Sequence, residues 1–115
     1  MYPANILMCK PEYFEVNYHG NEFMKDNIGG VNKSAALEQW EGLKNVYEKL
    51  GYAIKLIKPV KSLVDMVFTA NLCFPFIDKN GNKTAILSKM KNSQRKEEVK
   101  YLKQFLHRLE YEVIE

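Results

Sequence analysis

The stretch V-D-M-V-F-T-A-N, residues 64–71, decides the fold predicted for this chain. It follows a polar turn that contains Pro59, and it leads into an apolar run that continues from Leu72 to Ile77. Apolar runs of this kind typically form buried strands, so we predict a strand that begins near Asp65. Asn71 lies further along the same run. Polar residues at the ends of such a strand are well placed to meet a ligand, so Asp65 and Asn71 are candidate binding residues.

The length and composition indicate one folded domain over residues 1–115. The chain is 46% hydrophobic and 12% aromatic, which argues against disorder. Its net charge of +3 comes from 17 basic and 14 acidic residues and is too mild to predict a nucleic-acid partner. No run reaches the roughly 20 apolar residues of a membrane helix, and the first residues do not resemble a signal peptide. We therefore expect a soluble, cytoplasmic protein with no membrane partner.

Residue types and spacing alone provide no catalytic set. Cys9 and Cys73 lie in separate apolar runs, which predicts buried free thiols rather than a disulfide. His107 lies in a predicted helix and His19 in a long loop, and neither belongs to a Cys/His motif. These four residues are too dispersed for metal-ligand spacing, and no glycine-rich phosphate loop follows a strand. We predict no catalytic residue, no metal and no cofactor in this chain.

The amino-terminal half predicts a strand, a long loop, a helix and a second strand. The first strand covers Asn5–Cys9, and the loop covers residues 12–33, a length typical of lids. The alternative is a loop held in place by its aromatic and Met side chains. The helix can be capped by Asn32 or Ser34, and it ends before Gly51, where a left-handed residue is favoured. The strand Tyr52–Ile57 follows. The apolar face of the helix comprises Trp40, Leu43, Val46, Tyr47 and Leu50.

The carboxy-terminal half predicts a hairpin, a second helix and a final strand. Asn80-Gly81 is a strong turn signal between the apolar run and the strand Thr84–Leu87. The helix begins near Asn92 or Ser93, and the last strand is Tyr111–Ile114. The helix directs four apolar residues to the core: Val99, Leu102, Leu106 and Leu109.

The two passages from helix to strand resemble each other. Residues 43–55 align without gaps onto residues 102–114, so that Leu50 matches Leu109 and Tyr52 matches Tyr111. Each passage is also preceded by an apolar strand. This pattern predicts a duplicated strand–helix–strand unit, and such units stack because one alone cannot bury its apolar face. Two unrelated amphipathic helices can also resemble each other by chance.

Three polar residues form a candidate binding set. Asp65 can receive a guanidinium or ammonium group through charge-assisted hydrogen bonds, and Asn71 can add an amide contact. Arg95, at the start of the second helix, can hold a carboxylate with help from the helix terminus. Together these residues suit an amino acid with a basic side chain. The alternative is that Asp65 caps a turn and Arg95 forms a surface ion pair with Glu98.

Three motifs in order resemble the guanidino-modifying enzymes of the pentein superfamily, which include the dimethylarginine dimethylaminohydrolases and the amidinotransferases. The motifs are I-L-M-C-K-P-E-Y-F-E-V-N-Y-H-G-N-E-F-M (residues 6–24), D-M-V-F-T-A-N (residues 65–71) and S-K-M-K-N-S-Q-R-K-E-E-V (residues 88–99). The resemblance implies an α/β propeller of five strand–strand–helix–strand units with mixed sheets. This chain would supply about two of them, as the amino-terminal portion of a longer protein.

The resemblance also implies roles for the candidate residues. Asp65 matches an aspartate that contacts the substrate, and Arg95 matches an arginine that engages the amino-acid end of the substrate. Asn71 and Ala70 stand where the hydrolases carry carboxylates, and T-A-N resembles the amidinotransferase-like branch. This difference makes methylarginine an unexpected substrate. The family's catalytic cysteine and histidine lie in a portion that this chain does not contain, so we expect the chain alone to be inactive.

Two classes of function follow. The first is the amino-terminal portion of a guanidino-group hydrolase or amidinotransferase, which would contribute part of the substrate site. It would self-associate or bind a complementary carboxy-terminal chain, because an incomplete propeller exposes a sheet edge and apolar surface. The second is a non-enzymatic binding module with a ferredoxin-like sandwich fold. In the propeller, Asp65 and Arg95 should converge at one end of the structure, whereas in the sandwich they need not.

Overall fold

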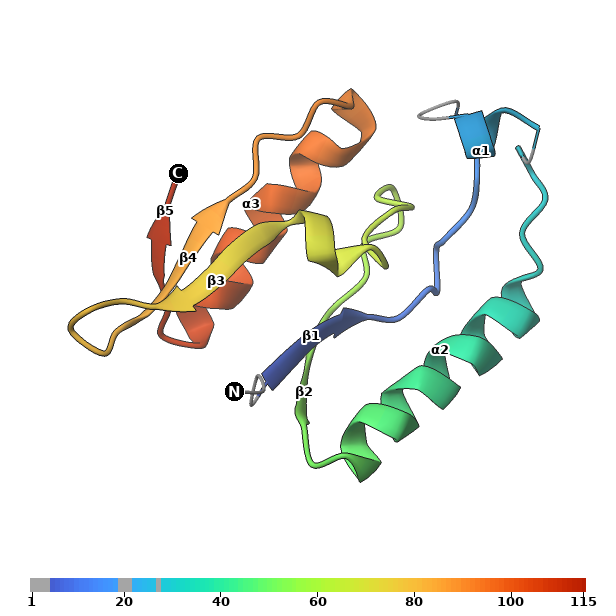
Figure 1. Ribbon diagram of the computed structural model, residues 1–115. Helices are drawn as coiled ribbons and strands as arrows, with labels where there is room; N and C mark the ends of the chain where they lie inside the picture. Colours follow the sequence, from blue (N-terminus) through green and yellow to red (C-terminus); the bar gives the residue numbers. More distant parts are fainter. Residues whose placement is uncertain (1–4, 19–21, 27) are drawn as a thin grey trace. The chain divides into compact units, whose positions relative to one another are not determined.

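The computed structural model describes residues 5–18, 22–26 and 28–115, and it divides into two compact units (Figure 1). The first unit covers Met1–Val67 and the second covers Phe68–Glu115. Each unit contains a parallel pair of strands joined through a helix. His19, a candidate loop histidine, falls outside the described residues.

The first unit is built on a two-stranded parallel sheet. Strand β1 (Asn5–Cys9) pairs with β2 (Ala53–Ile57), and helix α2 (Lys33–Lys49) lies between them in the sequence. Parallel neighbours need a long crossover connection, which here contains the predicted helix. A short helix, α1 (Glu22–Lys25), interrupts the predicted loop. The strand and helix predictions for this half are therefore confirmed to within a few residues.

The second unit is a three-stranded sheet with the order β3-β4-β5. Strands β3 (Cys73–Ile77) and β4 (Lys83–Leu87) form the predicted antiparallel hairpin, and Gly81 in its turn has a φ of 85°. Helix α3 (Ser93–Arg108) then connects β4 to β5 (Glu112–Ile114), which pairs with β4 in parallel. A strand–strand–helix–strand order is thus complete in this unit.

The predicted strand from Asp65 onward is wrong over residues 64–71. This segment forms tight turns followed by a short 3₁₀ helix, η1 (Thr69–Asn71), and the strand begins only at Cys73. Residues 63–66 are all buried in succession, whereas a strand with one covered face would alternate. The backbone bonds are local, with the Leu72 N–H donating to the Thr69 carbonyl at 3.1 Å. Short apolar runs do not distinguish such turns from strands.

The two helix ends share one geometry, as the repeat predicts. After α2, the N–H of Gly51 donates to the Glu48 carbonyl and the N–H of Tyr52 donates to the Tyr47 carbonyl. After α3, the matched residues Glu110 and Tyr111 donate to the matched carbonyls, those of His107 and Leu106. Both ends are Schellman motifs, with a φ of 92° at Gly51 and 64° at Glu110. The two helix-to-strand passages therefore share their local backbone geometry, and the duplication of a whole unit stays a prediction.

Each unit has a buried core and also an uncovered apolar surface. In the second unit, the predicted core residues Leu102 and Leu106 are buried, while Val99 and Leu109 are half-buried. In the first unit, the helix α2 buries no residue, and its Leu43, Val46 and Leu50 are 47%, 52% and 67% exposed. The core residues of the first unit are Met8, Cys9, Ile57, Leu63, Val64 and Met66.

The second unit exposes a row of apolar side chains that crosses its sheet. Phe74 lies opposite Ile86 in the register, and Ile86 lies opposite Ile114. All three are exposed, at 66%, 42% and 47%. Directly paired residues share a face of the sheet, so these three form one continuous surface.

The structure therefore confirms a mixed α/β fold with two sheets, both of them open among the described residues. No helix in the described part of the chain is long and apolar enough to cross a membrane.

Candidate functional site

Asp65 lies buried in the turns that precede η1. It is only 3% exposed, and its carboxylate accepts a hydrogen bond from the hydroxyl of Tyr18. Tyr18 belongs to the long loop before α2, so this contact joins two segments distant in the sequence within the first unit. The predicted cation-binding carboxylate thus contacts the predicted lid.

Arg95 and Glu98 form a buried ion pair at the start of α3. The Nε and Nη2 atoms of Arg95 donate to the two carboxylate oxygens of Glu98, each at 2.9 Å. The Glu98 side chain is 0% exposed and that of Arg95 is 12% exposed. The two residues are three apart in the helix, which places their side chains on one face. The predicted alternative of an Arg95–Glu98 pair is therefore correct in its partners, but the pair is not on the surface.

The same guanidinium reaches back to η1. Its Nη1 donates to Oδ1 of Asn71 at 3.0 Å, and its Nη2 donates to the carbonyl of Phe68 at 3.0 Å. The hydroxyl of Ser88 also donates to the carbonyl of Asn71, at 2.5 Å. Asn71 is thereby held through its side chain and through its backbone, while its side chain stays exposed.

These contacts set limits on what Arg95 can offer a ligand. A guanidinium has five N–H donors, and four contacts to Glu98, Asn71 and Phe68 are present. A ligand carboxylate can therefore take at most one N–H of Arg95 while this network stands.

The structure brings Asn71 and Arg95 into direct contact, as a shared site requires. Asp65 belongs to the first unit and Arg95 to the second, so their convergence on one ligand stays a prediction. Sequence reasoning missed two participants, Tyr18 and the buried role of Glu98. Glu98 had a detectable signal, because it precedes the buried Leu102 and Leu106 at regular spacings of four residues. Tyr18 had none, since loop contacts leave no periodicity.

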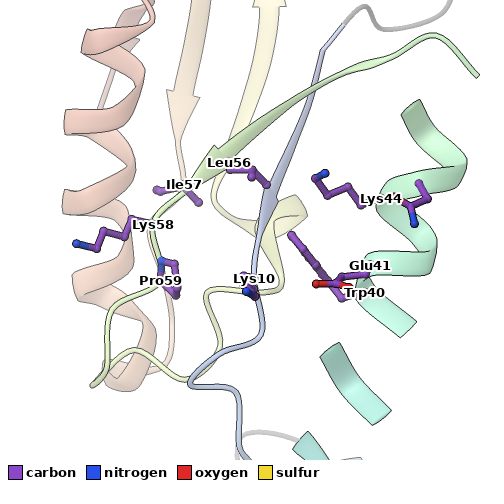
Figure 2. A pocket seen from close by; sticks show the side chains of 9 residues that line it. Lys10, Trp40, Glu41, Lys44, Leu56, Ile57, Lys58 and Pro59 are labelled. Carbon is purple, nitrogen blue, oxygen red and sulfur yellow. The ribbon is translucent and has the colours of Figure 1, made fainter. Parts of the chain in front are cut away.

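A separate groove lies in the first unit between α2 and β2. Its volume is about 440 Å³, and Trp40 projects from α2 toward the strand that carries Leu56 and Ile57 (Figure 2). None of the predicted site residues lines it. Its rim is mixed in charge, since it carries Lys10, Lys58 and Glu41, and the amino group of Lys44 is paired with Glu48 at 3.0 Å. The groove is lined by Lys10, Trp40, Glu41, Lys44, Asn45, Leu56, Ile57, Lys58 and Pro59.

Cys9 and Cys73 form no disulfide, as predicted; Cys9 is buried, whereas Cys73 is only half-buried. Burial raises the pKa of the Cys73 thiol, which disfavours the reactive thiolate. Among the residues that the structure describes, no group of His, Cys, Asp and Glu side chains is arranged to hold a metal ion.

Comparison with known proteins gives one consistent family. The family described as N,N dimethylarginine dimethylhydrolase, eukaryotic, matches residues 10–115. The bifunctional arginine dihydrolase/ornithine cyclodeaminase AgrE of Nostoc sp. is 32% identical over 95% of this chain and 15% of its own length. The N(G),N(G)-dimethylarginine dimethylaminohydrolase of Mycobacterium tuberculosis is 42% identical over 56% of this chain and 21% of its own length.

Solved structures agree with these relatives. The substrate-bound amino-terminal domain of ArgZ, a cyanobacterial arginine dihydrolase, has a TM-score of 0.87 at 31% identity, over 95% of this chain and 38% of that chain. AgrE with L-arginine has a TM-score of 0.86 at 32% identity, over 95% of this chain and 15% of the AgrE chain. The chain thus spans only a small part of each relative and matches the amino-terminal domain of ArgZ. On the family match over residues 10–115, this chain belongs to the dimethylarginine dimethylaminohydrolase family of the pentein superfamily.

Proposed function

We propose that this chain is the amino-terminal portion of a guanidino-group hydrolase and contributes part of the binding site for a guanidino amino acid. The observation that carries the proposal is the direct contact of Arg95 with Asn71, two residues that lie in separate family motifs. Asp65, buried and bonded to the loop residue Tyr18, supplies the carboxylate of the site. The catalytic cysteine and histidine come from outside these residues.

The residue chemistry suits a substrate such as arginine. A buried carboxylate favours a cationic group, because a charged ligand compensates the loss of water around Asp65. Asn71 supplies polar contacts for neutral or anionic atoms of the ligand. The arginine dihydrolases match more of this chain than the mycobacterial dimethylaminohydrolase does, which favours arginine over methylarginine. Both relatives are hydrolases by name, which favours hydrolysis over amidino transfer.

We also propose that residues 1–115 form a single domain that is part of a five-unit α/β propeller. The second unit has the strand–strand–helix–strand order of one propeller unit, and the matched Schellman motifs support a repeat of it in the first. The uncovered apolar surfaces on α2 and on the β3-β4-β5 sheet support a partner. That partner is a second copy or a complementary carboxy-terminal chain.

A ferredoxin-like binding module is not favoured as the alternative. That fold needs one continuous sheet, whereas the described strands form a two-stranded and a three-stranded sheet. The family match over most of the chain also argues for the guanidino-group enzymes.

The test is an assay for citrulline, ornithine and ammonia from L-arginine. We expect no turnover by the purified chain and turnover when a carboxy-terminal chain with the family's Cys and His is added. L-arginine binding to the chain, measured by calorimetry, is expected to weaken on Asp65→Asn. Turnover by the pure chain would overturn the assignment of the catalytic residues to another chain, and unchanged binding by Asp65→Asn would overturn the site.

A further inference from the structure

The buried carboxylate of Glu98 has no role in the site described so far, although it is a costly feature. A fully buried charge is tolerated only when its partners compensate the loss of hydration. Glu98 is 0% exposed on a helix whose other buried side chains are Leu102 and Leu106. An apolar residue would satisfy the packing at this position, so packing alone does not explain an acid here.

The geometry of the pair shows what the acid does. Both oxygens of Glu98 are occupied by one edge of the Arg95 guanidinium, through Nε and Nη2. A planar guanidinium held along one edge cannot rotate, so the directions of its other N–H groups are fixed. These N–H groups donate from Nη1 to Oδ1 of Asn71 and from Nη2 to the carbonyl of Phe68.

This chain of contacts also fixes the amide of Asn71. Arginine only donates hydrogen bonds, so the atom of Asn71 that faces Nη1 must be the oxygen. The NH₂ group of Asn71 then faces away from Arg95 on an exposed side chain. Asn71 is thus set to donate to an acceptor atom of a ligand, while one lone pair of its oxygen is already used.

We propose that Glu98 is a positioning residue for the substrate site: it orients Arg95, and Arg95 orients Asn71 so that its NH₂ group faces the ligand. The proposal rests on the proposed function for its ligand, a guanidino amino acid. Glu98 itself does not contact the ligand. The NH₂ group of Asn71 meets an acceptor atom of the ligand, and the second lone pair of its oxygen stays available for a guanidinium N–H.

The test compares Glu98→Gln with Arg95→Lys and with the matched control Glu97→Gln, an exposed neighbour on the same helix. Glutamine keeps the size of Glu98 but replaces one acceptor by a donor that opposes Arg95. Arg95→Lys keeps a charge for Glu98 but lacks the planar fork that reaches Asn71, so it tests the link from Arg95 to Asn71. Where Glu98→Gln does not fold, Glu98→Asp, which keeps the charge on a shorter side chain, takes its place with the same expected shift. Two quantities are measured on the full chain: the NMR resonance of the Asn71 side-chain amide and the affinity for L-arginine.

We expect the Asn71 amide resonance to shift in Glu98→Gln and in Arg95→Lys, and to stay in place in Glu97→Gln. L-arginine affinity should fall about tenfold in the first two variants, the loss expected for one charge-assisted hydrogen bond. A folded Glu98→Gln or Arg95→Lys with an unchanged Asn71 resonance would overturn the proposal, even with lowered stability, because the role would then be structural. If the unsubstituted chain binds no L-arginine while the resonance shifts as expected, the proposed function fails and the positioning role stands.

Discussion

Glu110 carries a conformational cost that its repeat partner avoids. Its φ of 64° lies in the left-handed region, where the matched residue of the first unit is Gly51. This conformation destabilises a residue that has a Cβ by roughly 1–2 kcal/mol. Glycine avoids this strain, but part of the benefit is lost because glycine makes the unfolded chain more flexible. We expect Glu110→Gly to stabilise the protein by about 1 kcal/mol, measured as a higher urea midpoint at an unchanged slope.

The reverse substitution serves as the control. An added Cβ at Gly51 would meet no atom within 4 Å, so Gly51→Ala changes only the backbone preference. We expect Gly51→Ala to destabilise by about 1 kcal/mol. Equal stability of Glu110→Gly and the unsubstituted chain would contradict the shared Schellman geometry.

Cys73 links the stability of the second unit to alkaline pH. Burial raises the pKa of its thiol, so the folded chain keeps this proton to a higher pH than the unfolded chain does. The contribution is complete below the ordinary thiol pKa and is lost as pH rises from there through the raised pKa. We expect the unfolding free energy of the unsubstituted chain to fall more steeply over this window than that of Cys73→Ala. Parallel curves in urea titrations across the window would rule this out.

At the level of single residues, the sequence predicted which side chains matter better than what they touch. Asn71 and Arg95 were selected from residue type and family position, and they do contact each other. The burial of Glu98 was not predicted, because an acid at helical spacing from Arg95 typically forms a solvent-exposed pair. Contacts made by loop residues such as Tyr18 depend on tertiary structure and leave no pattern in the sequence.

Among the elements, the β3–β4 hairpin is fixed by its turn. The carboxylate of Asp78 accepts from the N–H groups of Asn80 and Asn82, both at 2.8 Å, and Gly81 supplies the positive φ. The hydrogen bond from the Asn82 N–H is the main cause that holds the pKa of Asp78 below its usual value. These are the contacts expected of an Asx turn.

We therefore expect Asp78→Ala to lower the unfolding midpoint at neutral pH. Because the pKa of Asp78 is lowered in the folded chain, its contribution is present above the ordinary aspartate pKa and is lost as pH falls through the lowered value. The difference between Asp78→Ala and the unsubstituted chain should accordingly shrink in acid. Asp78→Asn, which keeps an acceptor without the charge, should lie between them; a deficit as large at the lowest pH as at neutral pH would contradict the charge assignment.

The elements that the sequence predicted best are those with strong local signals. Asn32 caps α2 by accepting from the Ala35 N–H at 3.0 Å, as its residue type predicts. The segment 64–71 failed because consecutive buried residues in turns look like a buried strand. Its backbone hydrogen bonds join residues only three apart in the sequence. The start of η1 is also held by a hydrogen bond from Arg95 of α3 to the carbonyl of Phe68, and no local pattern reveals such a contact.

For the whole molecule, the sequence predicted the α/β class, which rests on repeated local patterns, while the internal duplication stays a prediction that the matching helix ends support. It did not predict that only some of the apolar side chains on α2 would be covered. Trp40 and Tyr47 are half-buried, whereas Leu43, Val46 and Leu50 remain exposed. A helical apolar stripe shows that some surface must cover it, but not whether that surface lies in the same chain.

The exposed apolar surfaces make a specific prediction about association. Phe74, Ile86 and Ile114 form a continuous row across the β3-β4-β5 sheet. Uncovered rows of this kind drive association, because water is released when they meet another apolar face.

We expect sedimentation to show species heavier than the 13.4 kDa monomer, in proportions that rise with concentration. Phe74→Lys should weaken this association at least about tenfold, because it places a charge within the apolar row. Tyr101→Lys is the matched control, since Tyr101 is exposed at 37% on α3 and lies outside the row. A monomer at the highest concentrations, or equal effects of the two substitutions, would show that this sheet face is not the contact; the α2 variant Val46→Lys then tests the other surface in the same way.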